Sequence, residues 1–171
     1  ANRRDESVFD VYVQDREATG NDAERVVEGD GWLTLGGWSP DDSRLLVSEV
    51  YSNFDQDVAV LDVETGALTE LTPHEGTVRF QSATWGPRGE HVYLVSDRES
   101  DTLDLWCVDV DSGAFSLVAA DAEWEIDGVA IDDDTGRIAH STNVDGYTEL
   151  TVGELTAPAT IEETASSDLP P

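Results

Sequence analysis

The sequence predicts an all-β protein built from repeated antiparallel sheets. Apolar residues come in short bursts separated by turns rich in Gly, Pro, Asp and Ser. No segment keeps the apolar spacing of an amphipathic helix over about 10 residues or more. A pattern of strands and turns also returns at intervals of 45 to 47 residues. Together these features favour a fold made of one small β-unit used several times.

The repeat is visible when the chain is compared with itself at an offset of 47 residues. Trp38 then meets Trp85, and Pro40 meets Pro87. One register, an acid followed by alternating apolar residues and a second acid five positions later, occurs four times. Its first acids are Asp10, Asp57, Asp104 and Glu149. A register kept over the whole chain indicates a structural unit.

Each whole copy of the unit contains four predicted strands. In the central copy, the turn GPRGE follows the first strand and DSG precedes the fourth, as suits tight antiparallel connections. Its strands are expected over residues 78–85, 91–96, 103–110 and 115–120. The preceding copy predicts strands over 33–38, 44–50, 57–63 and 67–72. The following copy predicts 126–131, 137–142, 148–155 and 160–163, and the first copy only 8–14 and 24–29.

Four short antiparallel strands in a repeat of about 45–47 residues are typical of a β-propeller blade. We therefore expect a partial β-propeller: a half blade holding the last two strands, three whole blades and a tail. The expected boundaries are 8–30, 31–75, 76–122, 123–165 and 166–171. Closed propellers have about 4–8 blades. An arc has two uncovered faces, so we expect it to self-associate or to adjoin further sequence.

Charge is the strongest compositional signal. The 171 residues include 38 acids and nine basic residues, all arginine, for a formal net charge of −29. The acids are spread along the chain and accompany five tryptophans, unlike a disordered acidic tail. At molar salt the Debye length is about 3 Å and self-repulsion is screened. The composition therefore indicates a high-salt cytoplasm and a halophilic source.

The same charge excludes nucleic acid and anionic membranes as expected partners, because the sequence contains no basic patch. No apolar stretch approaches the roughly 18 residues of a membrane span. The first residues show no signal-peptide pattern, which supports a cytoplasmic location. The absence of methionine, together with a strand predicted among the first residues, indicates an excised or engineered segment.

Two stretches carry a family resemblance. WSPDDSRLLV, residues 38–47, and VSDRESDTLDLWCVDVDSG, residues 95–113, resemble the WD-like blade motifs of TolB-like propellers and of the N-terminal propeller of the prolyl oligopeptidase family. VAIDDDTGR, residues 129–137, departs from the motif, because tryptophan and proline are expected there.

In peptidases of that family, the propeller is followed by an α/β-hydrolase domain with a Ser-Asp-His triad and restricts access to peptides. The resemblance thus implies a gating, non-catalytic part of a dipeptidyl- or acylaminoacyl-peptidase-type serine peptidase, and the composition indicates a halophilic archaeon as its source. Its partners would be further blades, the hydrolase domain and the parent's peptide substrates. The sequence contains no G-x-S-x-G motif, so we carry over no catalytic residue. A stand-alone TolB-like module that binds proteins or peptides is the alternative.

We also expect no cofactor-binding and no metal-binding residue. His74, His91 and His140 occupy unrelated places in the repeat and lack metal-ligand spacing. The acidic turns 109–113 and 132–136 could bind calcium, but neither has the downstream Glu of an EF-hand, and Asp before Gly is ordinary turn chemistry. Cys107 lies in an apolar run and is expected to be a small buried hydrophobe.

Two repeated features could be functional or structural. The acids that begin the register could form a cation-binding collar, but we favour local hydrogen bonds to backbone amides. Trp38 and Trp85 could stack a ligand, but we favour packing between blades. The remaining tryptophans, Trp32, Trp106 and Trp124, lie outside this register, and Trp124 in an acidic loop could be exposed.

Overall fold

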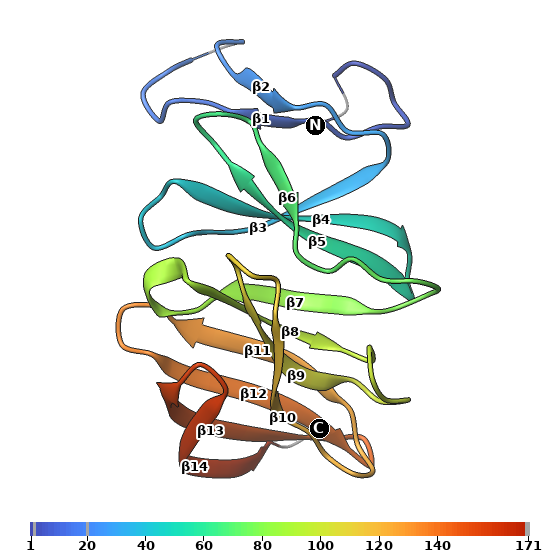
Figure 1. Cartoon of the computed structure of the whole chain (residues 1–171), viewed down its shortest axis with the longest axis vertical. Coiled ribbons are helices and arrows are strands. Elements are labelled where there is room, and N and C mark those ends of the chain that lie inside the picture. Colours follow the sequence, from blue (N-terminus) through green and yellow to red (C-terminus); the bar gives the residue numbers. More distant parts are fainter. Residues whose placement is uncertain (2, 20, 170–171) are drawn as a thin grey trace.

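Strands follow one another along the chain in the computed structural model, which describes residues 1, 3–19 and 21–169. They form one two-stranded and three four-stranded antiparallel sheets, and consecutive strands are neighbours within each sheet. The sheets lie one on another along the long axis of the molecule, with β1 and β2 at one end and β13 and β14 at the other (Figure 1). No helix in the described part of the chain is long and apolar enough to cross a bilayer.

Each sheet is one unit of the predicted repeat. The half blade consists of β1 (Val11–Val13) and β2 (Glu24–Val27). The first blade consists of β3 (Trp32–Trp38), β4 (Arg44–Ser52), β5 (Asp55–Asp62) and β6 (Leu68–Glu70). The second consists of β7 (Phe80–Trp85), β8 (His91–Ser96), β9 (Asp104–Asp109) and β10 (Phe115–Ala119), with the short 3₁₀ helix η1 (Pro87–Gly89) after β7. The third consists of β11 (Ile126–Asp132), β12 (Arg137–Val144), β13 (Tyr147–Ala157) and β14 (Thr160–Leu169).

Strand β14 is longer than the sequence predicts. It continues to Leu169, so residues 166–169 belong to the last strand and not to the expected tail. Ser166 and Ser167 pair with Thr151 and Leu150 of β13, because backbone hydrogen bonds extend a ladder without apolar side chains. Residues 170 and 171 of that tail lie outside the described residues.

Strand β8 shows why the middle of the stack is apolar throughout. Side chains alternate between the two faces of a strand. Val92 and Leu94 therefore pack against the first blade, and Tyr93 and Val95 against the third. All four are at most 2% exposed. A strand covered on both faces has apolar residues at successive positions, unlike a strand with one face in water.

Apolar side chains from successive sheets fill the spaces between them. The half blade packs on the first blade through residues such as Val11 and Leu61. Leu46 and Val60 meet the second blade, which in turn packs on the third through a cluster that includes Ile138. Burial of these side chains removes apolar surface from water and holds the stack together.

One type of turn recurs at strand junctions. In the first blade the Asp62 carboxylate accepts hydrogen bonds from the backbone N–H and hydroxyl of Thr65, and Gly66 follows with φ of 71°. Asp109 and Gly113 repeat this arrangement in the second blade, where Gly113 has φ of 69°. Glycine adopts this left-handed conformation without the steric cost of a side chain. The repeated Asp and Gly are therefore structural.

The two tryptophans that mark the repeat differ in their surroundings. Trp85 is 3% exposed, and its indole N–H donates to the Gly37 carbonyl at 2.9 Å. It packs between blades, as predicted, with the Arg44 guanidinium over its ring. Trp38 is 44% exposed, so the same prediction is wrong for this residue. It lies opposite Leu45 on the face toward the half blade, whose two described strands do not cover it.

Replacement of Leu94 tests whether the stack carries the stability. We expect Leu94→Ala to lower the free energy of unfolding by about 2–5 kcal/mol, because the fully buried side chain leaves a cavity between the first two blades. Leu117→Ala in β10 of the same sheet is the matched control, because Leu117 is 49% exposed. It should change the value by no more than about 0.5 kcal/mol. Urea titrations measure both, and equal effects would contradict this account.

Candidate functional site: an uncharged cleft between blades

A cleft of about 460 Å³ lies between the first and second blades. Its lining contains hydroxyl, amide and apolar side chains but no charged one, in a chain whose net charge is −29. Four other hollows in the described residues each include at least one charged side chain. The cleft is lined by Thr34, Ser48, Val50, Ser52, Asn53, Gln56, Phe80, Gln81 and Ser82.

The strand register places most of these residues together. Thr34 on β3 lies opposite Ser48 on β4, and Val50 lies opposite Gln56 on β5. Directly opposite residues share a face of the sheet, so these four point toward the second blade. Phe80, at the start of β7, closes the cleft from that blade. Segments far apart in the chain thus build the two walls of the cleft, and each wall combines polar side chains with one apolar side chain, Val50 or Phe80.

Ser82 marks an irregularity in β7. The pairing with β8 shifts register between Gln81 and Thr84, and Ser82 has φ of 54°. A left-handed conformation in a residue other than glycine costs roughly 1–2 kcal/mol. The first strands of the other two whole blades, β3 and β11, also shift register at comparable positions, so the irregularity belongs to the blade. The irregularity leaves Gln81 and Ser82 in the lining of the cleft.

Gln56 has a buried acceptor without a partner. The residue is 7% exposed, and its Nε2 donates to the Ser52 carbonyl at 2.6 Å. A carbonyl oxygen only accepts hydrogen bonds, so this contact determines which end of the amide is which. The remaining Oε1 finds no partner among the described residues. A buried acceptor left in this state costs about 1–3 kcal/mol.

An ionic cluster adjoins the cleft through Phe80, whose ring centroid lies 5.4 Å from that of His74. His74 Nε2 lies 3.1 Å from an Asp55 oxygen, and its Nδ1 lies 3.0 Å from both the Thr72 carbonyl and an Asp57 oxygen. All of these partners are acceptors, so the arrangement requires a proton on both ring nitrogens. Burial alone would lower the pKa of His74, but these contacts outweigh it and raise the pKa.

Arg79 connects the second blade to the third. Its backbone N–H and Nε donate to the two carboxylate oxygens of Asp97 at 2.8 and 2.7 Å, and its Nη2 lies 2.8 Å from Glu125. The side chain is 17% exposed. A guanidinium that bonds two carboxylates in this way holds the start of β7 beside the loop that leads into β11.

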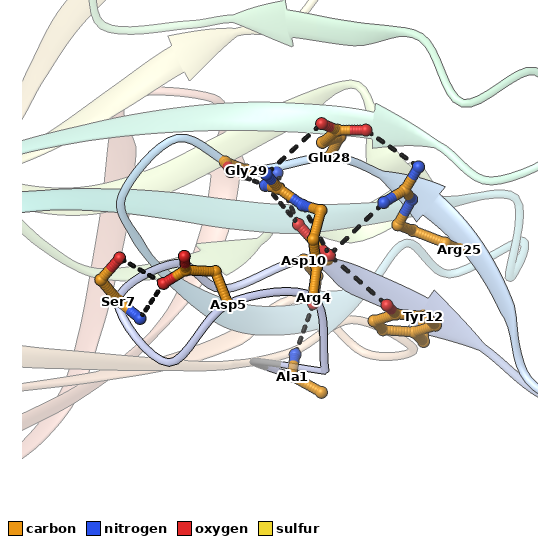
Figure 2. A network of polar contacts seen from close by, with 9 residues as sticks. All are labelled: Ala1, Arg4, Asp5, Ser7, Asp10, Tyr12, Arg25, Glu28 and Gly29. Atoms are coloured by element: carbon orange, nitrogen blue, oxygen red, sulfur yellow. Dashed lines mark hydrogen bonds and ion pairs between the residues drawn. The ribbon is translucent and has the colours of Figure 1, made fainter.

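The repeated acids make local contacts that differ from blade to blade. Asp10 has a completely buried side chain and accepts from the Gly29 backbone N–H at 3.1 Å and from Arg4 at 3.1 Å. Arg25 lies 3.7 Å away and also pairs with Glu28 (Figure 2). The hydrogen bond from Arg4 is the main cause that lowers the pKa of Asp10, against the opposing effect of burial.

The other three acids bond to side chains or lie at the surface, so the predicted backbone-amide bonds occur at Asp10 alone of the four. Asp57 accepts from the Thr72 hydroxyl at 3.2 Å, and Asp104 accepts from the Ser100 hydroxyl at 2.8 Å. Glu149 is exposed. Asp57 and Glu149 lie inside their strands, two residues after the start.

The remaining candidates have separate surroundings. His140, inside β12, has its pKa lowered mainly by burial. Cys107 is 1% exposed, and burial raises the pKa of its thiol to about 11, which confirms the prediction of a small buried residue. Trp32 is 59% exposed and Trp106 is 5% exposed. Trp124 is half-buried, so it is less exposed than the sequence indicated.

Acidic turns supply one group of clustered ligand atoms in the described part of the chain, from Asp132, Asp133 and Asp134. All three residues are exposed. Asp132 accepts from the backbone N–H groups of Asp134 and Thr135, as in an ordinary turn. In turn 109–113, Asp109 bonds Ser112 in the same manner. These contacts account for Asp132 and Asp109 without an ion. The absence of catalytic, cofactor and metal residues stays a prediction.

Sequence reasoning did not find the residues of the cleft. Gln56 stands between two acids at the start of β5. The neutral amide within this acidic stretch is the one sequence feature that could have drawn attention to Gln56. Arg79 is one of nine basic residues and directly precedes a strand. This rarity could likewise have drawn attention to Arg79 from the sequence. Ser82 carries no signal, because a bulge inside an alternating strand is not visible in residue types.

Comparison with known proteins gives structural likeness alone. No protein-family model matches the chain, and no curated protein matches it. A solved TolB from Agrobacterium tumefaciens superposes with a TM-score of 0.66 at 17% identity, covering 84% of this chain and 52% of that one. A prolyl endopeptidase superposes with a TM-score of 0.75 at 16% identity, covering 95% and 24%.

The chain is part of a β-propeller. The tricorn protease is a further neighbour, with a TM-score of 0.62 at 16% identity over 89% of this chain and 14% of that protein. This chain spans about half of the TolB structure and a quarter of the prolyl endopeptidase. At such identities the likeness establishes the fold, which confirms the predicted partial propeller of antiparallel four-stranded blades.

His74 should make stability depend on pH. Its pKa is raised in the folded chain, so its stabilising effect is fully present below the pKa of an unfolded histidine. The effect is lost as pH rises through the folded-state pKa. His140, with a lowered pKa, acts in the opposite direction. We therefore expect the protein with His74 to lose unfolding free energy above about pH 6.5 relative to the His74→Asn variant.

The measurement is a series of urea titrations at constant salt between pH 5 and 9, interpreted as the difference between the two proteins. His91→Asn, at a position outside the ionic cluster, serves as the control. A difference that grows as pH rises, or one that does not change with pH, would contradict the assigned protonation of His74.

Proposed function

We propose that the chain is the non-catalytic propeller portion of a prolyl-oligopeptidase-like serine peptidase, where it restricts access to a hydrolase domain. The superposition with a prolyl endopeptidase over 95% of this chain carries the proposal. The blade motifs at 38–47 and 95–113 support it from the sequence. The peptide substrates of the parent, and a peptidase activity of dipeptidyl or acylaminoacyl type, belong to the same proposal.

Uncovered surfaces at the half blade support association with more protein. Strand β1 pairs with β2 alone in the described sheet, so it lies at a sheet edge where a further strand could add. Leu35 and Trp38 of the neighbouring β3 are 56% and 44% exposed. Further blades of the parent chain are the proposed partner, and a second copy is the alternative for the isolated segment. Migration of the segment as a compact monomer in high-salt size-exclusion chromatography would contradict self-association.

A stand-alone TolB-like binding module is the second candidate function. The superposition with a TolB over 84% of this chain favours it. Such a module would bind proteins or peptides without a hydrolase domain. The parent gene separates the two candidates: a G-x-S-x-G motif within a few hundred downstream residues supports the peptidase, and further blades alone support the module.

The segment itself should not hydrolyse peptides. We expect turnover of a blocked proline-containing peptide to equal that of buffer, because the sequence has no nucleophile elbow. The assay uses the segment in molar salt, and the full parent enzyme under the same conditions is the control. Turnover by the segment would contradict both candidate functions.

We further propose that the protein works in a high-salt cytoplasm of a halophilic organism. The net charge of −29 and the use of arginine for every basic residue support this setting. Buried acids in the described residues are few, namely Asp10 and Asp104, and both have hydrogen-bond partners. Nearly all the negative charge therefore lies where dissolved cations can screen it.

Removal of salt should unfold the protein. We expect the strand signal in circular dichroism to be lost on dialysis from about 2 M KCl to about 10 mM, because the Debye length rises from about 2 Å to about 30 Å. Sucrose at matched osmolarity without salt is the control, since it does not screen charge. An unchanged spectrum at low salt would contradict the halophilic proposal.

A further inference from the structure

Ala1 and Asp10 pair through their backbones as residues on neighbouring antiparallel strands do. The Asp10 N–H donates to the Ala1 carbonyl at 2.9 Å, and the Ala1 nitrogen donates to the Asp10 carbonyl. Two residues that exchange both bonds form the hydrogen-bonded pair of an antiparallel ladder. Phe9, one residue earlier, donates to the Gly31 carbonyl at 3.0 Å, beyond the end of β2. Because successive residues of a strand direct their backbone groups to opposite sides, Ala1 lies at the edge of β1 that faces away from β2.

The repeat identifies the strand position that Ala1 occupies. Asp57 is the counterpart of Asp10 one repeat later, and it lies opposite Glu49 on β4. Ala1 therefore takes the place of Glu49, in the second strand of the half blade. In the first blade, residues 32–48, which comprise β3 and the first part of β4, lead into this position. The half blade contains neither of these two strands in its described sheet.

Contacts around Asp10 hold the segment that leads into β1 (Figure 2). The buried Asp10 carboxylate accepts from Arg4 at 3.1 Å and from the Gly29 backbone N–H at 3.1 Å. Arg4 also donates to the Gly29 carbonyl at 2.6 Å. Asp5 accepts from the backbone N–H and the hydroxyl of Ser7, as in a local Asx turn. The connection into β1 is thus held in place without a further strand.

Trp38 marks the surface that a first strand would cover. Its counterpart Trp85 lies on β7, which contacts β3 of the preceding blade, and donates its indole N–H to the Gly37 carbonyl of β3. Trp38 has the same place on β3, but the half blade beside it has no first strand in the described sheet. Trp38 is 44% exposed, and Leu35 on the same face is 56% exposed. A strand placed on the half blade as β3 is on the first blade would remove this apolar surface from water.

We propose that the segment directly before Ala1 in the parent protein forms the first two strands of the half blade. Its second strand continues the pairing of Ala1 along the edge of β1. Its first strand covers Leu35 and accepts the indole N–H of Trp38. This inference rests on the proposed association with further parts of the parent chain, and it names the segment and its contacts. A strand from a second copy that paired along all of this edge would have to displace Ala1 from Asp10.

A chain extended by a copy of its own residues 32–48, placed directly before Ala1, tests the proposal. These residues form the equivalent strands of the first blade. The copy of Val47 then comes opposite Tyr12, because Val47 lies opposite Ala59, the counterpart of Tyr12 one repeat later. A second extended chain, with one glycine inserted before Ala1, is the matched control. The insertion moves the pairing by one residue and turns the apolar side chains of the copy to the other face.

The backbone amide of Tyr12 reports the new pairing. Two residues after Asp10, it points to the same edge of β1, which has no strand beside it in the described sheet. We expect its hydrogen exchange, followed by NMR in molar salt, to be at least about tenfold slower in the extended chain than in the original chain, because the amide gains a hydrogen bond. The glycine control should slow it less than about twofold. Unchanged exchange in the extended chain, or equal slowing in the control, overturns the proposal.

Trp38→Phe tests the contact with the first strand, because it keeps an aromatic ring and removes the indole N–H. In the extended chain we expect it to lower the equilibrium constant for folding about fivefold, the effect of one hydrogen bond. In the original chain, where Trp38 is 44% exposed, the effect should be less than about twofold. Urea titrations in molar salt measure both. Equal effects in the two chains overturn the assigned contact.

The parent gene supplies a separate test if the extended chain does not fold. We expect it to encode two alternating strand patterns before Ala1, joined by a turn rich in Pro, Asp or Gly about ten residues before Ala1. A gene that encodes no such pair of strands there overturns the proposal. Failure of any of these tests leaves the peptidase proposal standing, because that proposal depends on the downstream gene and on the turnover assay.

Discussion

Face-to-face packing of the sheets is the interaction on which the rest of the structure depends. The second blade has apolar side chains on both faces, with Leu94 toward the first blade and Val95 toward the third, and both are fully buried. A sheet of this kind is stable only between two neighbours. Trp85 reinforces one of these contacts through its hydrogen bond to Gly37. The stack explains the apolar run in β8 and also the exposed Trp38, which faces an incomplete neighbour.

The polar groups follow from the same stacking. Neighbouring sheets bring loops from separate repeats together, and charged side chains connect them. Arg79 of the second blade binds Asp97 of the same blade and Glu125 of the third, whereas the pair of Asp10 and Arg4 lies within the N-terminal part of the chain (Figure 2). Because the chain has nine basic residues and 38 acids, few such ion pairs can form. The uncharged cleft is notable for the same reason, since acids are abundant almost everywhere else.

Much of the fold could be predicted from the chain alone, and little of the site could. The strand β8 occupies the predicted range 91–96, and the Asp-to-Gly turns recur where the sequence places them. These features depend on neighbours in the sequence. The cleft could not be predicted, because Gln56 and Phe80 come from different blades. The extension of β14 to Leu169 was missed because a ladder can continue through polar residues.

The sequence by itself determined the all-β class, the blade period, the turns and the acidic surface, since each follows from local alternation, turn chemistry or composition. Only the tertiary structure decided which residues at corresponding positions of the repeat have the same surroundings. Trp38 and Trp85 share a motif, yet one is exposed and one buried, because burial depends on the adjacent sheet. It also decided the protonation of His74 and the unpartnered oxygen of Gln56, because both depend on which groups the fold brings within hydrogen-bond distance.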